Sequence, residues 1–172
     1  MLVLLTKFMK KIKEKINLED FSKLKEKIRL IYKEIGSVYS PALKSNIVFN
    51  SDGFHHLSYD GSRKERNKRV QKNKFMFLKD GVEVLKKSTT IQEYRRLIYP
   101  IGKKDKNGLR KTALIEWFGF FSIINFSRKI RIKVIVRRVG EDKGKYHFWS
   151  IMPFWALSKD IRIIGSKEIE DK

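Results

Sequence analysis

The chain has 172 residues with 40 Lys and Arg against 19 Asp and Glu, a formal net charge of +21. Self-repulsion of this size destabilises a compact state, which indicates a polyanionic partner: nucleic acid, an acidic protein or an anionic membrane. The absence of cysteine excludes disulfides, cysteine-ligated zinc and thiol nucleophiles, and three histidines are too few to predict a metal cage. We expect no metal and no cofactor.

The N-terminal part is predicted to be helical. Residues 7–35 carry two apolar stripes at helical spacing, with a capping-box pattern at Asn17 and Asp20 between them and a C-cap at Gly36. The apolar run at residues 1–5 is too short for a secretory signal or a membrane span. We therefore expect a cytoplasmic protein without membrane contact, with a helical arm over residues 1–40 and a second unit over residues 41–172.

The middle of the chain mixes turns, short elements and basic residues. Ser40-Pro41 predicts a break, and residues 46–50 a short strand. A dense basic patch covers residues 63–74. A helix follows with Gly81 as an interruption, then a short helix through Arg96 capped by Thr90 and Glu93, and a mobile basic loop over residues 102–108.

The last third changes to strand-like patterning. Residues 113–124, 129–139 and 145–152 are rich in Ile, Val, Phe and Trp and are separated by hairpin-length segments. Pro153 is expected to end the third strand, and residues 161–164 form a candidate edge strand. The order predicts an α+β fold: N-terminal helices followed by an antiparallel β-meander of three to four strands packed on helices.

Counting residues outward from each predicted hairpin loop gives the directly opposed pairs and so assigns the meander residues to two faces of the sheet. With loops at 125–129 and 140–144, Arg137 lies opposite both Trp117 and His147, and Phe121 lies opposite Lys133. The apolar face is the predicted core: Phe118, Phe120, Ile132, Val134, Val136, Tyr146 and Phe148. The other face mixes cations and aromatics, typical of a surface that holds phosphates and stacks bases: Trp117, Phe121, Arg131, Lys133, Arg137, His147 and Trp149. The alternative is an ordinary solvated sheet face.

These residue types are those that RNA cleavage without metal requires. Imidazole titrates near neutrality and serves as base or acid, whereas arginine matches phosphate oxygens. The candidates are His55, His56 and His147, with Arg63, Lys133 and Arg137 as cations.

A family resemblance covers residues 46–153. It rests on the stretches IVFNSDGFHHLSYDGSRKER, KKSTTIQEYRR, WFGFFSIIN, KVIVRRVG and HFWSIMP. These resemble a group of small phage- and mobile-element-associated proteins that are proposed to share the fold of barnase, EndoU, colicin-type and RelE-type ribonucleases. The resemblance implies functional roles for His56, Arg63 and Arg137. Its last motif often has a polar residue at the position of His147 and continues to Ser150.

Combining both lines gives catalytic candidates His56, His147, Arg137 and Arg63. His147 is favoured over Ser150, which the register places on the core face, opposite Val134, unless a bulge turns it. His55 has no assigned role. The expected nucleic-acid contacts are Lys64, Arg66, Arg69, Lys133, Arg131, Trp117 and Trp149.

The leading hypothesis is a toxin-like, metal-independent endoribonuclease that acts on RNA and has an acidic inhibitor protein. One alternative is a non-catalytic RNA- or DNA-binding protein with structural histidines. Another is a basic subunit of a protein assembly, which needs an apolar patch such as Trp149, Pro153, Phe154 and Trp155. Convergence of the histidines and arginines in the fold distinguishes the first from the second.

Overall fold

The computed structural model describes residues 18–125 and 129–154, which form an α+β fold as the sequence predicts. The helices are α2 (Leu18–Ile35), α3 (Ser51–Ser58), α4 (Lys68–Met76) and α5 (Leu78–Lys87). The strands are β1 (Ser37–Ser40), β2 (Ser45–Val48), β3 (Glu93–Ile101), β4 (Lys111–Asn125), β5 (Lys129–Val139) and β6 (Tyr146–Phe154), with a 3₁₀ turn, η1 (Glu141–Lys143), between the last two. The predicted helix before residue 18 and the predicted strand at 161–164 lie outside the described residues.

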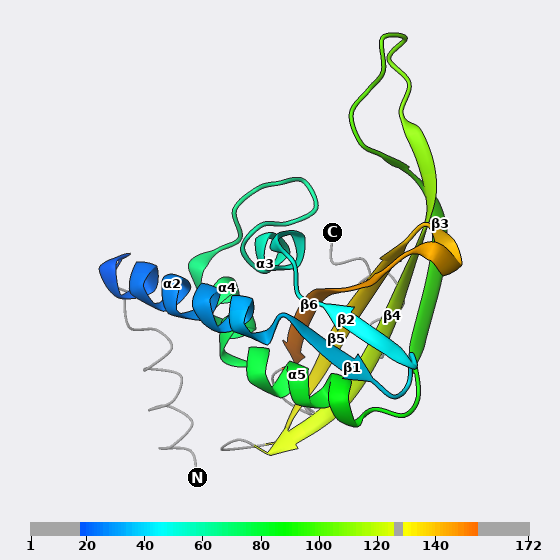
Figure 1. Cartoon of the computed structure of the whole chain (residues 1–172). Coiled ribbons are helices and arrows are strands. Elements are labelled where there is room, and N and C mark those ends of the chain that lie inside the picture. Colours follow the sequence, from blue (N-terminus) through cyan, green and yellow to red (C-terminus); the bar gives the residue numbers. More distant parts are fainter. Residues whose placement is uncertain (1–17, 126–128, 155–172) are drawn as a thin grey trace.

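All described strands belong to one sheet in the order β1-β2-β6-β5-β4-β3 (Figure 1). The predicted meander, β4 to β6, is antiparallel and forms its centre, whereas β2 joins β6 in parallel. The sheet has six strands in place of the three to four expected. The additional ones are β1 and β3, and β3 replaces the short helix predicted from Thr90 and Glu93 because all of residues 93–101 pair with residues 111–119 of β4.

The predicted register is confirmed over most of the meander. Trp117 lies opposite Arg137, and Arg137 lies opposite His147. The register between β5 and β6 then shifts by one residue, because Phe148 pairs with Val136 and Ser150 pairs with the adjacent Ile135. Trp149 is thus the extra residue of a β-bulge. The prediction that Ser150 lies opposite Val134 is therefore wrong by one position, and β6 also continues through Pro153.

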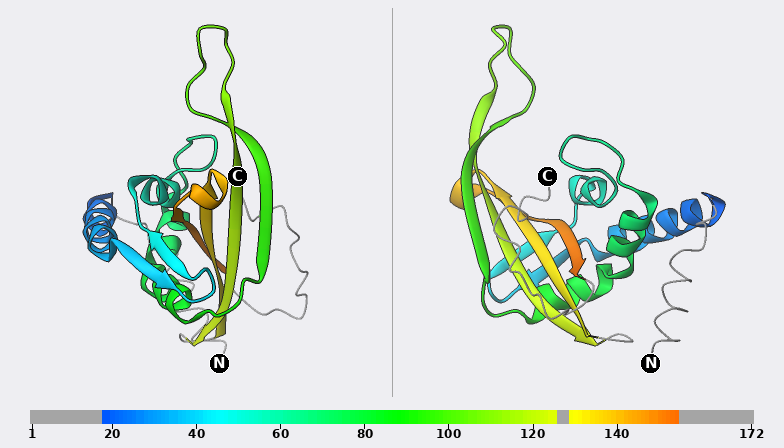
Figure 2. Two further views of the ribbon diagram at one scale, coloured as in Figure 1. Left: turned by 45° about the vertical axis from the view of Figure 1, so that its right-hand side comes forward. Right: turned by 180° about the vertical axis from the view of Figure 1, so that it is seen from behind.

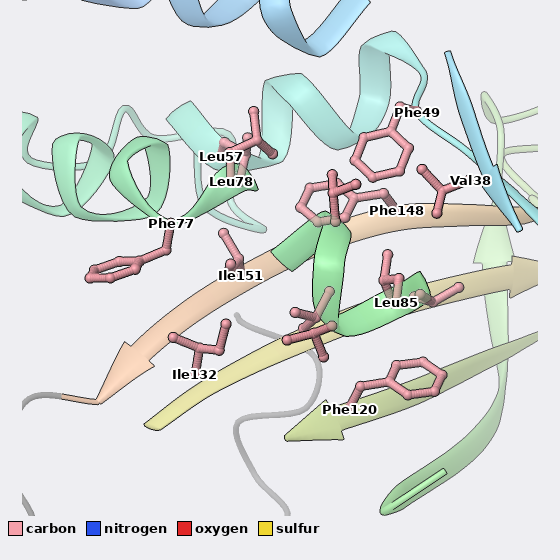
Figure 3. Packing of buried hydrophobic residues seen from close by; sticks show 14 of the residues in the cluster. Val38, Phe49, Leu57, Phe77, Leu78, Leu85, Phe120, Ile132, Phe148 and Ile151 are labelled. Atoms are coloured by element: carbon pink, nitrogen blue, oxygen red, sulfur yellow. The ribbon is translucent and has the colours of Figure 1, made fainter. Parts of the chain in front are cut away.

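The helices cover one face of the sheet and bury the main core against it (Figures 1 and 3). All four described helices contribute, and the sheet supplies the apolar face that the register predicted. The residues labelled in Figure 3 are Val38, Phe49, Leu57, Phe77, Leu78, Leu85, Phe120, Ile132, Phe148 and Ile151. A separate small cluster of Ile115, Trp117 and Ile135 is packed by Ile101, Val139, Trp149 and Met152.

Two glycines have separate structural roles, one at the end of α2 and one inside α5. Gly36 has φ +59° after the last residue of α2, which is the predicted left-handed cap. Gly81 does not interrupt a helix as predicted. It lies inside α5, where an added Cβ would lie 2.7 Å from the Ile151 side chain, so its smallness allows α5 to approach β6. The break between α4 and α5 falls at Phe77.

The β3–β4 hairpin extends beyond the rest of the sheet (Figure 2). Pairing of β4 with β5 stops at Ile115, whereas its pairing with β3 continues to Lys111. The predicted basic loop is at the tip. There the Asp105 side chain accepts hydrogen bonds from the backbone N–H groups of Asn107 and Leu109. A two-stranded ribbon therefore presents this loop.

Candidate functional site

Two of the four predicted catalytic residues contact the Trp149 ring, and a third lies opposite one of them. The guanidinium carbon of Arg137 lies 4.4 Å from the Trp149 ring centre. The His56 ring, from α3, stacks on the same indole at 4.3 Å between centres. His147 lies directly opposite Arg137, so the two residues share a face of β5 and β6. Sequence segments separated by about ninety residues thus meet at Trp149, but the predicted convergence also included Arg63, which is not part of these contacts.

His147 is held by Asn50, the N-cap of α3. Asn50 Oδ1 accepts a hydrogen bond from the Gly53 N–H at 3.0 Å, so its amide nitrogen faces His147 Nδ1, also at 3.0 Å. Because Nδ2 only donates, Nδ1 is the acceptor and the neutral ring carries its proton on Nε2. Burial, together with the nearby charges of Arg137 and Lys145, lowers the His147 pKa against the opposing effect of Asp52. His147 therefore offers a neutral N–H donor at Nε2.

The two adjacent histidines have different surroundings. His56 is 4% exposed, and Arg66 Nη2 lies 3.5 Å from its Nε2. A guanidinium only donates, so in this contact Nε2 accepts. His55 is exposed and stacks on Tyr59 at 4.2 Å between ring centres. The geometry thus makes His56 a packed residue of the cluster and leaves His55 at the surface.

Arg66, and not Arg63, is the basic residue against His56. Besides the ring contact, Arg66 Nε donates to the backbone oxygens of His56 and Tyr59 at 3.3 and 3.0 Å. Arg63 is exposed in the turn after Asp60, with φ +64°. The basic residue against His56 is thus Arg66, and the role that the resemblance implies for Arg63 stays a prediction.

Arg137 is a half-buried cation with an unsatisfied donor. Its Nε is buried without a hydrogen-bond partner in the described part of the chain, and the same holds for Trp149 Nε1. Burial lowers the Arg137 pKa, whereas the charges of Asp52 and Tyr99 raise it. Arg137, His147 and Trp149 together form a set of N–H donors, which we call the donor cluster. An anion is the chemical group that such a cluster accommodates.

Several predicted nucleic-acid contacts are occupied within the protein. Lys133 is 3% exposed and forms a salt bridge with Glu93 at 2.5 Å, and Trp117 is buried in the small cluster. Neither side chain is available for phosphate binding or base stacking. Arg131 packs over the Phe121 ring at 4.2 Å. Lys64 and Arg69 are exposed, as a contact surface requires.

Ser150 has a buried structural contact. Lys74, on α4, is 4% exposed and its Nζ donates to Ser150 Oγ at 2.8 Å and to the Ile151 carbonyl at 3.1 Å. The burial of both side chains favours His147 over Ser150 as the residue that reaches a substrate. It also removes Lys74 from the exposed basic patch.

Sequence reasoning missed Asn50 and Asp52. Asn50 was expected to end a strand, although an Asn directly before a helical segment is a common N-cap signal. Asp52 is exposed on the first turn of α3, and its charge acts on both Arg137 and His147. No sequence pattern indicated a carboxylate at this site, because residue 52 reaches residues 137–147 through the parallel pairing of β2 with β6, which links segments far apart in the chain.

Other features bear on the alternatives. Among residues 18–125 and 129–154, no group of three or more His, Asp or Glu side chains is arranged to hold a metal ion. None of the described helices combines the length and apolar character needed to span a membrane. Of the predicted apolar patch, Trp149 packs between α3 and β5, and residue 155 lies outside the described residues.

Comparison with known proteins yields no relative: no family model matches the chain, and neither the curated proteins nor the solved structures contain a significant match. The resemblance to the ribonuclease fold group therefore stays a prediction.

Proposed function

We propose that the protein binds RNA and is a metal-independent endoribonuclease, with the donor cluster of Arg137, His147 and Trp149 as its phosphate site. The observation that carries the proposal is that Arg137, whose Nε is buried without a hydrogen-bond partner in the described part of the chain, lies directly opposite His147 on one face of the sheet. Phosphate oxygens match such donors, and the net charge of +21 attracts the RNA backbone.

The reaction that suits this geometry is transesterification. The ribose 2′-oxygen attacks phosphorus, the bond to the 5′-oxygen breaks, and a 2′,3′-cyclic phosphate and a 5′-hydroxyl end form. Arg137 and His147 donate hydrogen bonds to the non-bridging oxygens, where negative charge develops. Asp52 is the carboxylate whose charge reaches both residues, so we assign it the 2′-hydroxyl proton. The leaving 5′-oxygen takes its proton from water.

A non-catalytic RNA-binding protein is the second candidate, and one observation favours it. Each of His56 and His147 receives an N–H group at one ring nitrogen, and His56 is almost fully buried. Neither imidazole then acts as a simple general base. In that case the donor cluster holds a phosphate without cleaving the chain.

The deciding experiment incubates the full chain with total RNA in EDTA. We expect cleavage that leaves 2′,3′-cyclic phosphate ends and falls by about 100-fold or more in Arg137→Ala, the loss typical of removing a donor to the developing charge. Asp52→Asn should also lose cleavage while retaining RNA binding. The control for Arg137→Ala is Lys87→Gln, which removes one positive charge at an exposed position on α5.

Binding without cleavage, weakening steeply with salt, would establish the second candidate. If cleavage is found, we expect the producing cell to contain an acidic inhibitor protein, because a free cationic ribonuclease attacks the RNA of its own cell.

A further inference from the structure

A pocket lies next to the donor cluster. It is a pocket of about 520 Å³ between α2 and α3, and it contains Asn50, the residue that holds His147. The pocket and the donor cluster are therefore connected through one side chain. Neither the charge pattern nor the resemblance predicted it, because α2 lies outside the matched residues.

One side of the pocket suits a flat, apolar ring. Phe49 and Phe54 contribute apolar surface, and His55 and Tyr59 form a parallel stack. Planar side chains of this kind stack nucleobases in proteins that bind single-stranded RNA.

Two lining residues have polar atoms that need a partner. Tyr32 is 3% exposed and Ser58 is 1% exposed, and both hydroxyl oxygens are buried without a hydrogen-bond partner in the described part of the chain. A hydroxyl can donate or accept, so either matches the mixed donor and acceptor edge of a base. Buried hydroxyls without partners are costly, which makes them unusual in a pocket with only a packing role.

The other side of the pocket is cationic. Lys25, Arg29 and Lys33 recur every four residues along α2 and so lie on one helix face, and all three line the pocket. Lys25 and Arg29 have carboxylate neighbours only at 3.9 Å, Glu65 and Glu26 respectively. Exposed ion pairs of this length are weak, so a phosphate can compete for these cations.

We propose that this pocket binds one nucleotide of single-stranded RNA, with the base against His55 and Tyr59 and its phosphate on the cations of α2. The inference rests on the proposed RNA-directed function and makes the pocket the subsite next to the donor cluster. The protein then binds one unpaired nucleotide in the pocket, next to the phosphate that the donor cluster binds. Its substrate class is single-stranded RNA, because a base in a duplex is not free to enter a pocket.

The test is isothermal titration calorimetry of the full chain with the four nucleoside 3′-monophosphates, the matching nucleosides and inorganic phosphate. Arg29→Gln should weaken nucleotide binding by about fivefold or more, as expected for loss of a charge-assisted contact. The matched control Lys87→Gln removes the same charge outside the pocket and should leave the affinity unchanged. Tyr32→Phe removes only a hydroxyl, so it should reduce the preference among the four bases without lowering the melting temperature.

The outcomes separate the pocket from the proposed function. Equal losses in Arg29→Gln and Lys87→Gln would mean that net charge alone drives binding, and would overturn the inference. Tighter binding of inorganic phosphate than of any nucleotide would do the same, because the base would then contribute nothing. Nucleotide binding lost in Arg29→Gln but retained in Arg137→Ala supports the pocket, even if the chain never cleaves RNA. Cleavage that is unchanged in all pocket variants would keep the proposed function and reject the subsite.

Discussion

Replacing Asn50 with Asp is expected to raise the pKa of His147. In the native protein the Asn50 amide donates to His147 Nδ1, and the ring is neutral. Asp retains the N-cap, since Asn and Asp are equally good caps, and its first oxygen still accepts from Gly53. Its second oxygen needs a hydrogen atom on Nδ1. Both the neutral Nδ1–H tautomer and the imidazolium supply that hydrogen, and the negative charge of the carboxylate stabilises the imidazolium.

The magnitude follows from the surroundings of His147. A carboxylate at hydrogen-bond distance raises the pKa of a cationic partner by about 1–3 units, and partial exposure at this site places the effect near about 1 unit, equivalent to about 1.4 kcal/mol. In the native protein the His147 pKa is lowered, so its contribution to stability is present above about pH 6.5 and is lost as pH falls through the folded pKa. In Asn50→Asp the folded pKa is higher than in the native protein. The stability lost between about pH 8 and about pH 5 should therefore be smaller in Asn50→Asp than in the native protein.

The assay has two readouts. Nuclear magnetic resonance titration of the His147 ring protons gives the pKa directly, and urea unfolding at about pH 5 and about pH 8 gives the stability change. The control is Asn67→Asp, the same substitution at the N-cap of α4, which should leave the His147 pKa unchanged. A His147 pKa that is no higher in Asn50→Asp than in the native protein would refute the assigned amide orientation and tautomer.

Three further predictions concern stability. Ser150→Ala should lower the free energy of unfolding by about 1–3 kcal/mol, because the buried ammonium of Lys74 loses an acceptor. Gly53→Ala should lower it by about 1–3 kcal/mol or more, because a Cβ there would overlap a carbonyl oxygen of β6. Glu93→Ala should cost about 2–4 kcal/mol, because Lys133 is then buried without its counter-charge. Urea unfolding measures each change.

Two of these have a matched comparison. Ser51→Ala is an exposed change on the same helix as Gly53 and should stay within about 0.5 kcal/mol of the native protein. If Gly53→Ala is equally neutral, the close approach of α3 to β6 is not as described. Combining Glu93→Ala with Lys133→Met should recover part of the loss, since the buried charge is gone; a double variant no more stable than Glu93→Ala alone would argue against the pair.

The central hairpins were predictable because two independent signals agreed. Loop lengths and alternating apolar residues both placed Arg137 opposite His147, and a slip by one residue would have exposed the core face. The bulge at Trp149 had no such signal. In HFWSIM, both Trp149 and Ile151 are apolar. The alternation of apolar and polar residues therefore does not show at which residue of β6 the side chains change from one face of the sheet to the other.

Other misses arose where tertiary structure overrides local patterns. Glu93 resembles an N3 capping residue, but pairing with β4 makes the segment a strand and the carboxylate a partner for Lys133. The basic patch was treated as one surface, although α4 turns Lys74 into the core. His55 and His56 are adjacent in sequence, and on a helix adjacent side chains point in directions about 100° apart, so one could face the sheet and the other solvent.

Strand β3 is the last in the sheet order, and its outer backbone edge has no neighbouring strand in the described part of the chain. It exposes Ile98 (73%) and Tyr99 (56%), features of a strand that can pair with another molecule. Pro100 has no backbone N–H group, so β3 has one hydrogen-bond donor fewer for pairing with another strand. In dilute salt, the net charge of +21 also keeps two copies of the protein apart. Charge repulsion is screened beyond about 3 Å at about 1 M salt, so concentrated salt should promote edge-to-edge association of this protein. Solutions of moderate ionic strength are therefore the conditions in which it should stay monodisperse.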